Sequence, residues 1–537
     1  MKTKANAAVN WQEKFIELEA SSAQKIAELE ASFSSSTKEL ERRIAELEAL
    51  KRYYEEQFRL AKQRQYGPSS EKSNFGEQLG LFDEAENTAD LKKAVELEKI
   101  TYERPKRTSK LKDDLADAPM ETVEHSLPED EQFCPTCGNA LHSMSTEECC
   151  HVEIIPAKVV LKRNLRHVYA CRSCEKTAVK ATIIRAPMPE PVIKGSLASP
   201  SAVAHIATQK YVNAVPLYRQ EQDLLRQGLT LSRQTMANWL IKSSQDWLEP
   251  LYERMRRLLL EESTLHADET VLQVLKEPGR KATTNSYMWL YRTGKYARHP
   301  IVLYEYQPTR SSSHPKRFLE KYTGYLHADG FAGYHSLDQA IIVVGCWAHL
   351  RRKLDEAIKA LPEADRANAT AQYGFDICNR LFAFESQWAD LEPDERLKKR
   401  LVDAKPLAEE LFRWAKSVNA LPKSALGKAV NYAVEQQSWL MNVFLDGRLE
   451  LSNNRGERSI KPFVIGRKNW LFCNSQKGAR SSSVIYSMIE TAKENGLKPF
   501  EYLEYIFQEL PNMTASFLDD ILPWAEGLPD RIKAGKL

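Results

Sequence analysis

A tetrapeptide, Leu-His-Ala-Asp, occurs twice in this chain and ends once at Asp268 and once at Asp329. In each copy the carboxylate terminates an apolar, strand-like run, where a charged side chain is costly unless a partner compensates it. Two carboxylates at neighbouring strand ends repel each other, so a bound divalent cation is the simplest explanation. Capping of a turn would explain either aspartate alone, but not the repetition. The repeat therefore predicts a metal site at the ends of two strands.

The residues around the repeat predict a mixture of strands and helices. Three strand-like runs joined by short turns come first: Thr264–Val274, Tyr287–Thr293 and Ile301–Tyr306. A helix follows over His314–Lys321, and the apolar run Ile341–Trp347 predicts a further, buried strand. Three hairpin-connected strands, a helix and more strands are the order of an RNase H-like core. The predicted fold class is therefore multidomain α/β.

Glu457 is the candidate for a third metal ligand. It is the only acid between Ser452 and Ser482, in a predicted helical turn just ahead of Pro462. Seven basic residues share this stretch and suit the phosphates of a polyanion: Arg455, Arg458, Lys461, Arg467, Lys468, Lys477 and Arg480. A second basic concentration lies between His151 and Pro187. Because the net charge of the chain is only +3, both stretches could also be ordinary solvated faces.

The spacing of the three carboxylates predicts an insertion. Asp329 follows Asp268 by 329 − 268 = 61 residues, which suits two strands of one core, but Glu457 follows Asp329 by 457 − 329 = 128 residues. Helical patterns fill the interval: Phe375–Leu391, Pro406–Ala420 and Ala425–Leu440. A helical insertion therefore separates the last two elements of the site.

The N-terminal region predicts one long helix. Residues 11–62 contain no Gly or Pro, and Gly67-Pro68 ends the pattern. Apolar side chains recur there every seven residues: Ile26, Phe33, Leu40, Leu47 and Tyr54. Pairing with a second chain as a coiled coil and packing within the chain both stay open, because Ser22 and Ser36 weaken the apolar seam.

Two Cys-x-x-Cys pairs predict a zinc ribbon. Cys134 and Cys137 form the first pair, Cys171 and Cys174 the second, and strand-like residues lie between them. Four thiolates close a tetrahedral Zn²⁺ site, and the ion supplies folding energy to a unit too small for its own core. Rival ligands lie inside the loop: Cys149, Cys150 and His151. A pair of knuckles that never binds metal is the remaining alternative.

A helix-turn-helix pattern follows the ribbon. Leu217–Gln227 predicts a helix, Gly228 a turn, and Ser232 the N-cap of a second helix to Ser243. Arg233 and Gln234 would then lie in the first turn of the second helix, where such motifs contact base edges. Packing within the domain is the alternative interpretation.

Composition excludes several classes of protein. With 42% hydrophobic and 28% charged residues among 537, the chain is neither disordered nor collagen-like. Its longest uncharged apolar run, Ala340–Ala348, is about half of the ~20 residues that a membrane-spanning helix needs, and the first thirty residues hold no signal-peptide core. Nine cysteines are too sparse for a disulfide scaffold. We expect a cytoplasmic protein, associated with the nucleoid when bound to DNA.

Several segments resemble, in order, the motifs of bacterial insertion-sequence transposases of the family numbered 66: Thr264–Thr270, Tyr325–Tyr334, Gly345–Lys353, Asn453–Glu457 and Ile465–Phe472. Tyr66–Lys72, the ribbon and Tyr486–Glu501 follow the same order, so the resemblance covers nearly the whole chain. By that resemblance, Asp268, Asp329 and Glu457 are the Asp-Asp-Glu catalytic triad. Ser452 stands where many relatives have Asp, which concerns only local capping.

The resemblance implies a DNA transposase that binds the ends of a mobile element and catalyses metal-dependent phosphodiester hydrolysis and strand transfer. Two Mg²⁺ (or Mn²⁺) ions would lie between the three carboxylates, with Asp268 bridging both. The expected partners are double-stranded DNA at the element ends and the target, a second copy of the chain, and accessory proteins of the same element; no membrane partner is expected. The basic residues after Ser452 would neutralise backbone phosphates.

Three aromatic side chains near the motifs have two interpretations each. Trp470 could stack on an unpaired base, or pack in the core. His266 and His327 lie two residues before the aspartates, so each could polarise an attacking water, or serve as a core histidine.

Two other functions remain as alternatives. One is an RNase H-like structural nuclease or resolvase, which cuts DNA without joining it. The other is a zinc-ribbon regulator with a decayed catalytic domain, which predicts a missing carboxylate, although all three are present. The predicted domain order is a coiled-coil helix at 11–66, a linker at 67–130, a zinc ribbon at 131–187, a helix-turn-helix DNA-binding region at 188–257, the first part of the RNase H-like core at 258–356, a helical insertion at 357–445, the second part of the core at 446–500 and an acidic C-terminal tail at 501–537.

Overall fold

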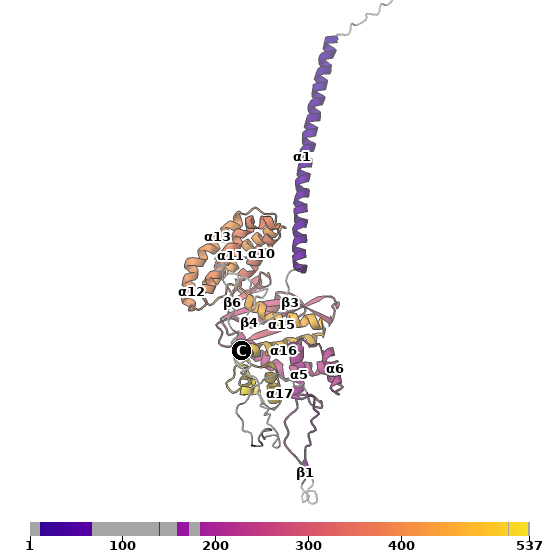
Figure 1. The fold of residues 1–537 in the computed structure, drawn as a ribbon, viewed down its shortest axis with the longest axis vertical. Helices are drawn as coiled ribbons and strands as arrows, with labels where there is room; N and C mark the ends of the chain where they lie inside the picture. Colours follow the sequence, from indigo (N-terminus) through magenta and orange to yellow (C-terminus); the bar gives the residue numbers. More distant parts are fainter. Residues whose placement is uncertain (1–10, 67–138, 140–157, 171–182, 514, 535–537) are drawn as a thin grey trace, which may run out of the picture. The chain divides into compact units, whose positions relative to one another are not determined.

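The computed structural model describes residues 11–66, 139, 158–170, 183–513 and 515–534. The chain separates into two units (Figure 1). A helical unit combines residues 1–91 with 344–452, and a sheet unit combines residues 92–343 with 453–537. The chain thus leaves the sheet unit after residue 343 and returns to it at residue 453.

The sheet unit is built on a mixed β-sheet with the strand order β5-β4-β3-β6-β7, and β8 pairs with the far end of β3. β3, β4 and β5 form an antiparallel meander, whereas β6 runs parallel to β3. The bounds are β3 (Thr264–Lys276), β4 (Asn285–Thr293), β5 (Val302–Gln307), β6 (Gly324–Ala328), β7 (Ile341–Gly345) and β8 (Cys473–Ser475). The predicted mixed α/β class is confirmed.

Two helices, α15 (Asn454–Trp470) and α16 (Gln476–Glu494), lie on one face of this sheet, and Arg292 of β4 donates hydrogen bonds to Ser459 of α15 and Glu494 of α16. β5 is an edge strand, so one side of its backbone lacks a strand partner. The Thr491 hydroxyl accepts from the Val302 N–H and donates to the Val302 carbonyl, both at 3.0 Å. The Ser487 hydroxyl accepts from the Tyr304 N–H at 2.8 Å. Side chains of α16 therefore close the sheet edge.

Within the described residues of the sheet unit, four α-helices come before the sheet. They are α5 (Pro200–Tyr211), α6 (Leu217–Arg226), α7 (Arg233–Ser243) and α8 (Glu249–Leu259), with a π-helical turn, η3 (Ser244–Leu248), between the last two. α6 and α7 match the predicted helix-turn-helix to within one residue. Gly228 takes φ +85° in the turn, a conformation that favours glycine. The Ser232 hydroxyl caps α7 by accepting from the Thr235 N–H at 3.1 Å, as its position predicts.

The C-terminal segment is folded, which corrects the prediction of an acidic tail over residues 501–537. α17 (Pro499–Glu509) packs on α5, and Arg254 of α8 binds the Asp519 carboxylate through two hydrogen bonds, at 2.7 and 2.9 Å. The acids of the segment suggested a tail, but apolar residues at helical spacing between them form a buried stripe: Tyr502, Leu503, Ile506 and Phe507.

The helical unit contains the predicted insertion. Its helices are α10 (Trp347–Lys359), α11 (Thr370–Gln387), α12 (Pro393–Lys399), α13 (Lys405–Ser417) and α14 (Ala425–Met441). The unit begins before residue 357, because the predicted strand over Ile341–Trp347 ends at Gly345 and Trp347 is the first residue of α10. An apolar run of this length does not distinguish a strand from the start of a buried helix.

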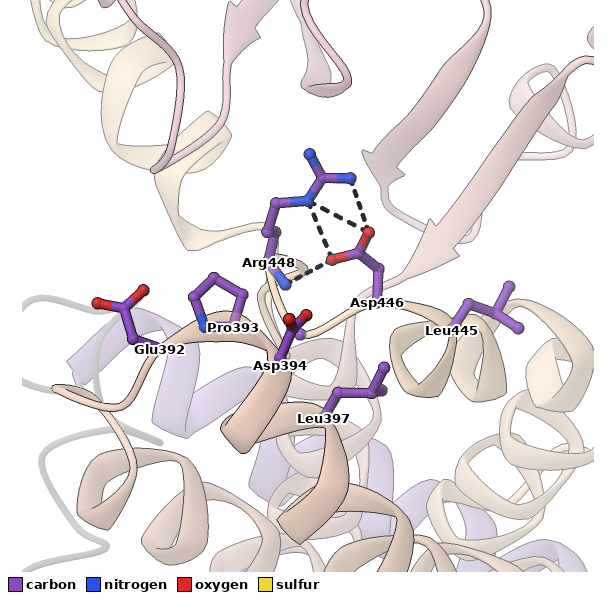
Figure 2. A pocket seen from close by; sticks show the side chains of 8 residues that line it. Glu392, Pro393, Asp394, Leu397, Leu445, Asp446 and Arg448 are labelled. Atoms are coloured by element: carbon purple, nitrogen blue, oxygen red, sulfur yellow. Dashed lines mark hydrogen bonds and ion pairs between the residues drawn. The ribbon is translucent and has the colours of Figure 1, made fainter.

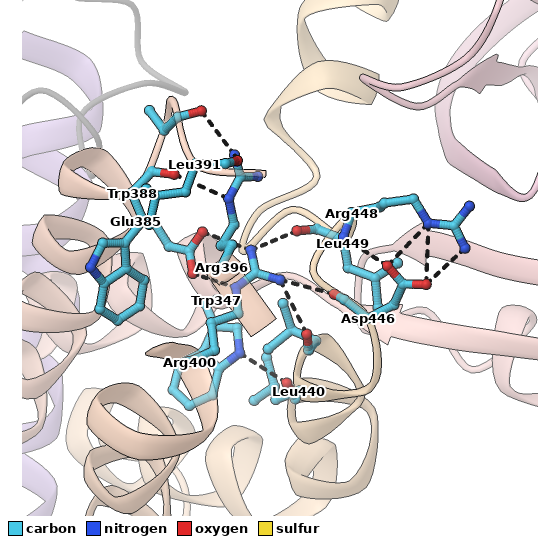
Figure 3. A network of polar contacts seen from close by, with 12 residues as sticks. Trp347, Glu385, Trp388, Leu391, Arg396, Arg400, Leu440, Asp446, Arg448 and Leu449 are labelled. Carbon is cyan, nitrogen blue, oxygen red and sulfur yellow. Dashed lines mark hydrogen bonds and ion pairs between the residues drawn. The ribbon is translucent and has the colours of Figure 1, made fainter. Parts of the chain in front are cut away.

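A buried arginine, Arg400, links α11 to the last residues of this insertion through hydrogen bonds (Figure 3). Arg400 forms two hydrogen bonds with the Glu385 carboxylate, at 2.6 and 2.7 Å. Its remaining N–H groups donate to the carbonyl oxygens of Val443, Asp446 and Leu449. Because each N–H finds an acceptor, the guanidinium can be buried, and it ties α11 to the segment by which the chain leaves the helical unit.

A cavity of about 380 Å³ opens beside the same segment and is lined by Glu392, Pro393, Asp394, Leu397, Leu445, Asp446, Gly447 and Arg448 (Figure 2). Asp446 and Arg448 turn toward each other and form an ion pair at 2.8 Å. Gly447 packs so closely that a Cβ atom there would lie 1.7 Å from the Pro393 carbonyl oxygen. The cavity contains none of the candidate site residues.

The N-terminal helix is continuous, as predicted: α1 spans Trp11–Tyr66. The seven-residue apolar positions are all exposed along it, from Ile26 at 56% to Phe33 at 76%. Near its C-terminal end, Leu60 is buried and the Glu56 carboxylate accepts from the Ala425 N–H of α14 at 2.6 Å. Most of the apolar stripe of α1 therefore faces solvent in a single chain.

Most of the predicted ribbon lies outside the described residues, including its cysteines at 134, 137, 171 and 174. The predicted linker at 67–130 also lies outside them. Two short strands of this region are described, β1 (Val168–Ala170) and β2 (Ile183–Arg185), which pair antiparallel. Residues 158–167 have no regular structure, although the sequence predicts strand there. Within the part of the chain that the structure describes, no helix combines the length and apolar character that crossing a bilayer requires.

Candidate active site

The parallel pairing of β3 with β6 brings Asp268 and Asp329 to the same level of the sheet. In this register His266 lies opposite His327. Each aspartate follows its histidine by two residues, so the two carboxylates extend from adjacent strands at equal height. Asp329 directly follows β6, but Asp268 lies inside β3, which continues to Lys276; the prediction that both end a strand is wrong for Asp268.

Backbone donors orient both carboxylates. The Glu269 N–H donates to Asp268 Oδ1 at 2.8 Å, and the Phe331 N–H donates to Asp329 Oδ1 at 3.0 Å. The second bond closes a tight turn immediately after β6. The two carboxylates are therefore positioned by their own strands.

His266 and His327 form a stacked pair beneath the aspartates. Their ring centroids lie 4.5 Å apart with an interplanar angle of 14°, and both side chains are fully buried. Side chains without solvent exposure cannot hold a water that attacks an external substrate. The core interpretation of these histidines is the one that the structure supports.

Glu457 lies in the first turn of α15, on the face of the sheet that this helix covers. Its side chain is buried, with a relative exposure of 5%. A carboxylate is favourable at this position because the helix dipole is positive at its N-terminus. The helix does not stop ahead of Pro462 but continues through it to Trp470.

The electrostatic surroundings of Asp268 include the other two predicted ligands. Burial raises the pKa of Asp268 well above its ordinary value, and the negative charges of Glu269, Glu457 and Asp329 raise it further. Asp268 is thus within electrostatic reach of both other predicted ligands. A buried carboxyl group such as Asp268 can ionise once a cation neutralises the negative charges around it, and carboxylate oxygens suit a hard divalent ion. The donor set fits the predicted metal.

Asn453, to which the sequence interpretation gave no role, links two of these elements. Its side-chain NH₂ donates to the Ala267 carbonyl at 2.8 Å, so its oxygen faces His266 Nδ1 at 2.9 Å. This bond makes Nδ1 the protonated nitrogen of His266. Asn453 immediately precedes α15, and it therefore joins the start of the Glu457 helix to the strand that carries Asp268. Its position in the Asn453–Glu457 motif was the available signal.

Glu269 is a second residue that the sequence interpretation missed. It follows Asp268, so its side chain extends from the opposite face of β3. The Tyr334 hydroxyl donates to Glu269 Oε2 at 2.6 Å, and Arg310 Nε donates to Oε1 at 2.7 Å. The Arg310 guanidinium also lies 4.0 Å from the centre of the Phe331 ring. Glu269 thus holds the loop that follows Asp329.

The basic residues after Ser452 divide into two groups. Arg467 reaches the site, because its NH1 donates to Thr270 Oγ1 at 3.3 Å, two residues beyond Asp268 on β3. Lys468, Lys477 and Arg480 are exposed beyond it, and Arg480 pairs with Glu249 at 3.1 Å.

The remaining basic residues belong to the first half of α15. Burial favours a raised pKa for Glu494, but the charges of Arg292, Arg455 and Arg458 hold it below its ordinary value. Arg455 and Arg458 therefore act partly on α16, while Lys461 is half-buried on α15.

Trp470 packs inside the sheet unit. Its ring meets Phe463 edge-on at 5.5 Å, and its indole nitrogen is buried. Core packing is the interpretation that these contacts support.

Arg233 and Gln234 are exposed at the start of α7. The Arg233 guanidinium lies 5.8 Å from the centre of the Tyr218 ring, and Gln234 donates to Asn238 at 3.0 Å. The two side chains are accessible to a partner.

Comparison with known families gives four matches along the chain. Residues 195–481, more than half of it, match the family described as "Transposase IS66 family". Residues 487–524 match the "IS66 C-terminal element", and residues 131–175 match the "zinc-finger binding domain of transposase IS66". Residues 53–122 match "Transposase C of IS166 homeodomain". Asp268, Asp329 and Glu457 all lie in the first range, and the four predicted zinc ligands lie in the third.

Curated relatives come from Sinorhizobium fredii (strain NBRC 101917 / NGR234). The uncharacterized protein y4jD is 30% identical over 408 residues, which cover 73% of this chain and 77% of that protein. The uncharacterized protein y4qI is 29% identical over 447 residues, or 80% of each chain. The similarity therefore extends over most of both proteins.

Proposed function

This chain belongs to the IS66 family of transposases, and from that premise we propose that Asp268, Asp329 and Glu457 catalyse metal-dependent cleavage and strand transfer of DNA. Family membership implies a DNA transposase with DNA-binding regions. The observation that carries the finer proposal is geometric. Asp268 and Asp329 each follow by two residues one of the histidines that pair between β3 and β6, and the Asn453 side chain joins the strand of Asp268 to the start of the helix that carries Glu457.

We further propose that the sheet unit is an RNase H-like core. Its support is the order of the strands: an antiparallel meander of β3, β4 and β5, then β6 parallel to β3, and β7 beyond it. α15 follows after the insertion and carries the third carboxylate. Such a core presents its acids from the central strand, its parallel neighbour and one covering helix.

The roles of the residues follow from their surroundings. The pKa of Asp268 is raised by burial and by the charges of neighbouring acids, which include both other candidates. Asp268 would therefore contact both ions, while Asp329 and Glu457 would each contact one. Two Mg²⁺ or Mn²⁺ ions bound there would supply an activated water or 3′-hydroxyl on one side of the phosphodiester and stabilise the leaving oxygen on the other. Arg467, beside Thr270, would neutralise a phosphate next to the site.

Three further parts of the molecule would bind metal, DNA or a second copy. The zinc-finger match over residues 131–175 supports Zn²⁺ held by Cys134, Cys137, Cys171 and Cys174. The exposed Arg233 and Gln234 of α7 would contact base edges of the element ends. The exposed apolar seam of α1 supports pairing with a second chain.

Conservative replacement of the acids tests the chemistry. Asp268→Asn, Asp329→Asn and Glu457→Gln should each reduce Mg²⁺-dependent cleavage of a plasmid that carries the two terminal repeats by about 1,000-fold or more, since metal coordination supplies several kcal/mol. Binding of the repeats should stay nearly unchanged. Asp520→Asn, an exposed acid of the sheet unit, is the matched control. Full cleavage by any of the three variants would contradict the assignment.

A second assay separates the transposase from a nuclease of the same fold. Duplexes that end in a free 3′-hydroxyl at the terminal repeat bypass cleavage. The wild-type protein should join these ends to a target plasmid, and the three variants should not. Cleavage without joining would favour the structural nuclease or resolvase.

A further inference from the structure

Two large apolar side chains stand exposed at the turn between α15 and β8. Leu471 is 62% exposed and Phe472 is 43% exposed. The residues on either side are anchored: Trp470 packs on Phe463, and Cys473 is buried in β8, where it pairs with Val274 of β3. The exposed pair is therefore held on a rigid support.

The backbone at this turn is strained. Leu471 has φ +64° and ψ −52°, and the Phe472 N–H donates to the Trp470 carbonyl at 2.8 Å. This three-residue turn is rare and costly for a residue with a branched side chain, whereas glycine adopts positive φ without penalty. A leucine that keeps this conformation gains nothing for folding from its exposed side chain.

The surroundings of the pair are basic. No acid occurs between Glu457 and Glu490, and Lys468 and Lys477 are exposed on either side of the turn. Arg467, which precedes Lys468 on α15, donates a hydrogen bond to Thr270, two residues beyond Asp268 on β3. Apolar side chains flanked along the chain by two exposed lysines suit a polyanion with an apolar interior, which describes the stacked bases of DNA.

From these observations we propose that Leu471 and Phe472 form a wedge that enters a base step of bound DNA. The inference rests on the proposed function, because it takes DNA as the substrate of the neighbouring carboxylates. The thirteen residues from Glu457 to Trp470 span about 20 Å of helix. Along a duplex this corresponds to about six base pairs from the cleaved bond, at ~3.4 Å each.

A wedge of this kind would open the duplex close to the site. Inserted apolar side chains unstack a base step and kink the DNA. Two side chains are far too few for a stable protein interface, which buries more than about 1,000 Å². Leu471 and Phe472 lie on an anchored turn in the same unit as the three acids. From this position they would distort a DNA end while it is cleaved.

The test compares two DNA probes by fluorescence anisotropy: an intact duplex of about 30 base pairs, three helical turns, and the same duplex with a central abasic site. An abasic site already lacks a stacked base, so insertion of the two side chains there costs less free energy than insertion into an intact base step. The wild-type protein should bind the abasic duplex about tenfold more tightly, which is the scale of one stacked side chain. The double variant Leu471→Gly, Phe472→Ser should bind both duplexes equally.

Controls separate the wedge from folding and from charge. Leu471→Gly relaxes the positive φ, so the double variant should keep its thermal midpoint. Phe517→Ser, at an exposed phenylalanine elsewhere in the sheet unit, should keep the tenfold preference. Lys468→Gln with Lys477→Gln should weaken both complexes by the same factor.

Several outcomes would overturn the proposal. The double variant could keep the preference, or the wild-type protein could show none while still binding DNA and cleaving it; either result removes the wedge and leaves the proposed function intact. If the double variant differs from the wild-type protein in sedimenting mass but keeps the preference for the abasic duplex, Leu471 and Phe472 form a protein contact instead. Absence of binding to both duplexes would remove the wedge and the proposed function together.

Discussion

Asn453 joins two elements that lie far apart in sequence, the strand that carries Asp268 and the helix that carries Glu457. It donates to the Ala267 carbonyl and accepts from His266, so one buried amide fixes the strand of Asp268 relative to the helix of Glu457. His266 in turn stacks on His327, which precedes Asp329. The side chains of Asn453, His266 and His327 thus link the elements that carry the three candidate acids.

Replacement of this amide should misplace the acids. We predict that Asn453→Ala removes two buried hydrogen bonds, to the Ala267 carbonyl and to His266, and lowers stability by about 1–3 kcal/mol. DNA cleavage should fall by ~100-fold, as for an error of about 1 Å in a catalytic group, while DNA binding is kept. Thermal unfolding and cleavage assays at a temperature where the variant is folded measure the two effects separately.

Asn213→Ala is the control for this variant, because Asn213 is exposed and its side chain makes only a 3.3 Å hydrogen bond to Gln209. The control should match the wild-type protein. If Asn453→Ala cleaves DNA at the wild-type rate, Asn453 does not position the acids.

The raised pKa of Asp268 predicts a dependence of stability on pH in the absence of metal. The folded protein holds this proton more tightly than the unfolded chain does. The resulting stability is fully present below the unfolded pKa of about 3.9 and is lost as the pH rises through the folded pKa, by at most about 1.4 kcal/mol per pH unit. In EDTA, the midpoint of thermal unfolding should therefore fall between pH 5 and pH 8 more for the wild-type protein than for Asp268→Asn.

The pH experiment carries its own control. Addition of Mg²⁺ at pH 8 should stabilise the wild-type protein and should stabilise Asp268→Asn less, because the ion replaces the proton as the partner of the carboxylates. Parallel pH curves for the two proteins would show that Asp268 has an ordinary pKa.

The strands, helices and turns of this chain follow local rules closely. Ser232 caps α7, and the seven-residue pattern of α1 ends where Gly67-Pro68 would break a helix. The exceptions occur where a neighbouring element overrides the local pattern. Gly345 ends β7 before its apolar run ends, and the acidic C-terminal segment packs on α5.

The ribbon is the element for which we predict bound zinc. One Zn²⁺ per chain should be held by Cys134, Cys137, Cys171 and Cys174, and the double variant Cys171→Ser, Cys174→Ser should lose it. Metal analysis of the purified protein measures the ratio. If the double variant still binds one zinc per chain, the ligands are the alternative residues Cys149, Cys150 and His151.

Cys378→Ala provides the control for thiol chemistry. Cys378 is buried in α11, and burial raises the pKa of its thiol to about 12, so it stays protonated and binds no zinc. The zinc content of this variant should equal that of the wild-type protein.

The whole molecule interleaves two units, and its three candidate catalytic acids belong to one of them. Asp268 and Asp329 precede the helical unit in sequence, and Glu457 follows it. The segment that leaves the helical unit is tied to α11 by Arg400, which orders the chain shortly before it reaches Asn453. The exposed seam of α1 offers a surface for a second copy at this scale.

Removal of residues 1–66 should leave metal-dependent nicking of bound DNA but impair the coupled joining of two ends. The proposed catalytic acids all lie beyond residue 260, and we expect the joining of two ends to require two chains held together. Sedimentation at equal concentration should show a smaller mass for the truncated protein. An unchanged mass together with unimpaired joining would mean that α1 does not pair.

Charge substitutions refine this test while retaining the contact between Glu56 and Ala425. Phe33→Glu with Leu40→Glu places charges on the seam and should dissociate the assembly. Ser35→Glu with Arg42→Glu places charges two residues further along, about 200° around the helix, and should not.

Local physical chemistry was sufficient for much of this protein. A strand repeats every two residues and a helix every 3.6, so the apolar patterns alone predicted β3 to β6, the helix-turn-helix, α1 and the helical insertion. The repeated Leu-His-Ala-Asp and the single acid among seven bases identified Asp268, Asp329 and Glu457 as candidates.

Only the tertiary structure decided how these residues meet. The parallel register of β3 and β6 sets Asp268 and Asp329 at the same level of the sheet, and α15 packs on β3 and carries Glu457, 128 residues after Asp329, in its first turn. The buried amide of Asn453, the hold of Glu269 on the loop after Asp329, and the exposure of Leu471 and Phe472 all depend on partners distant in sequence. No local pattern encodes them, because hydrogen bonds and burial are set by whichever residues the fold brings into contact.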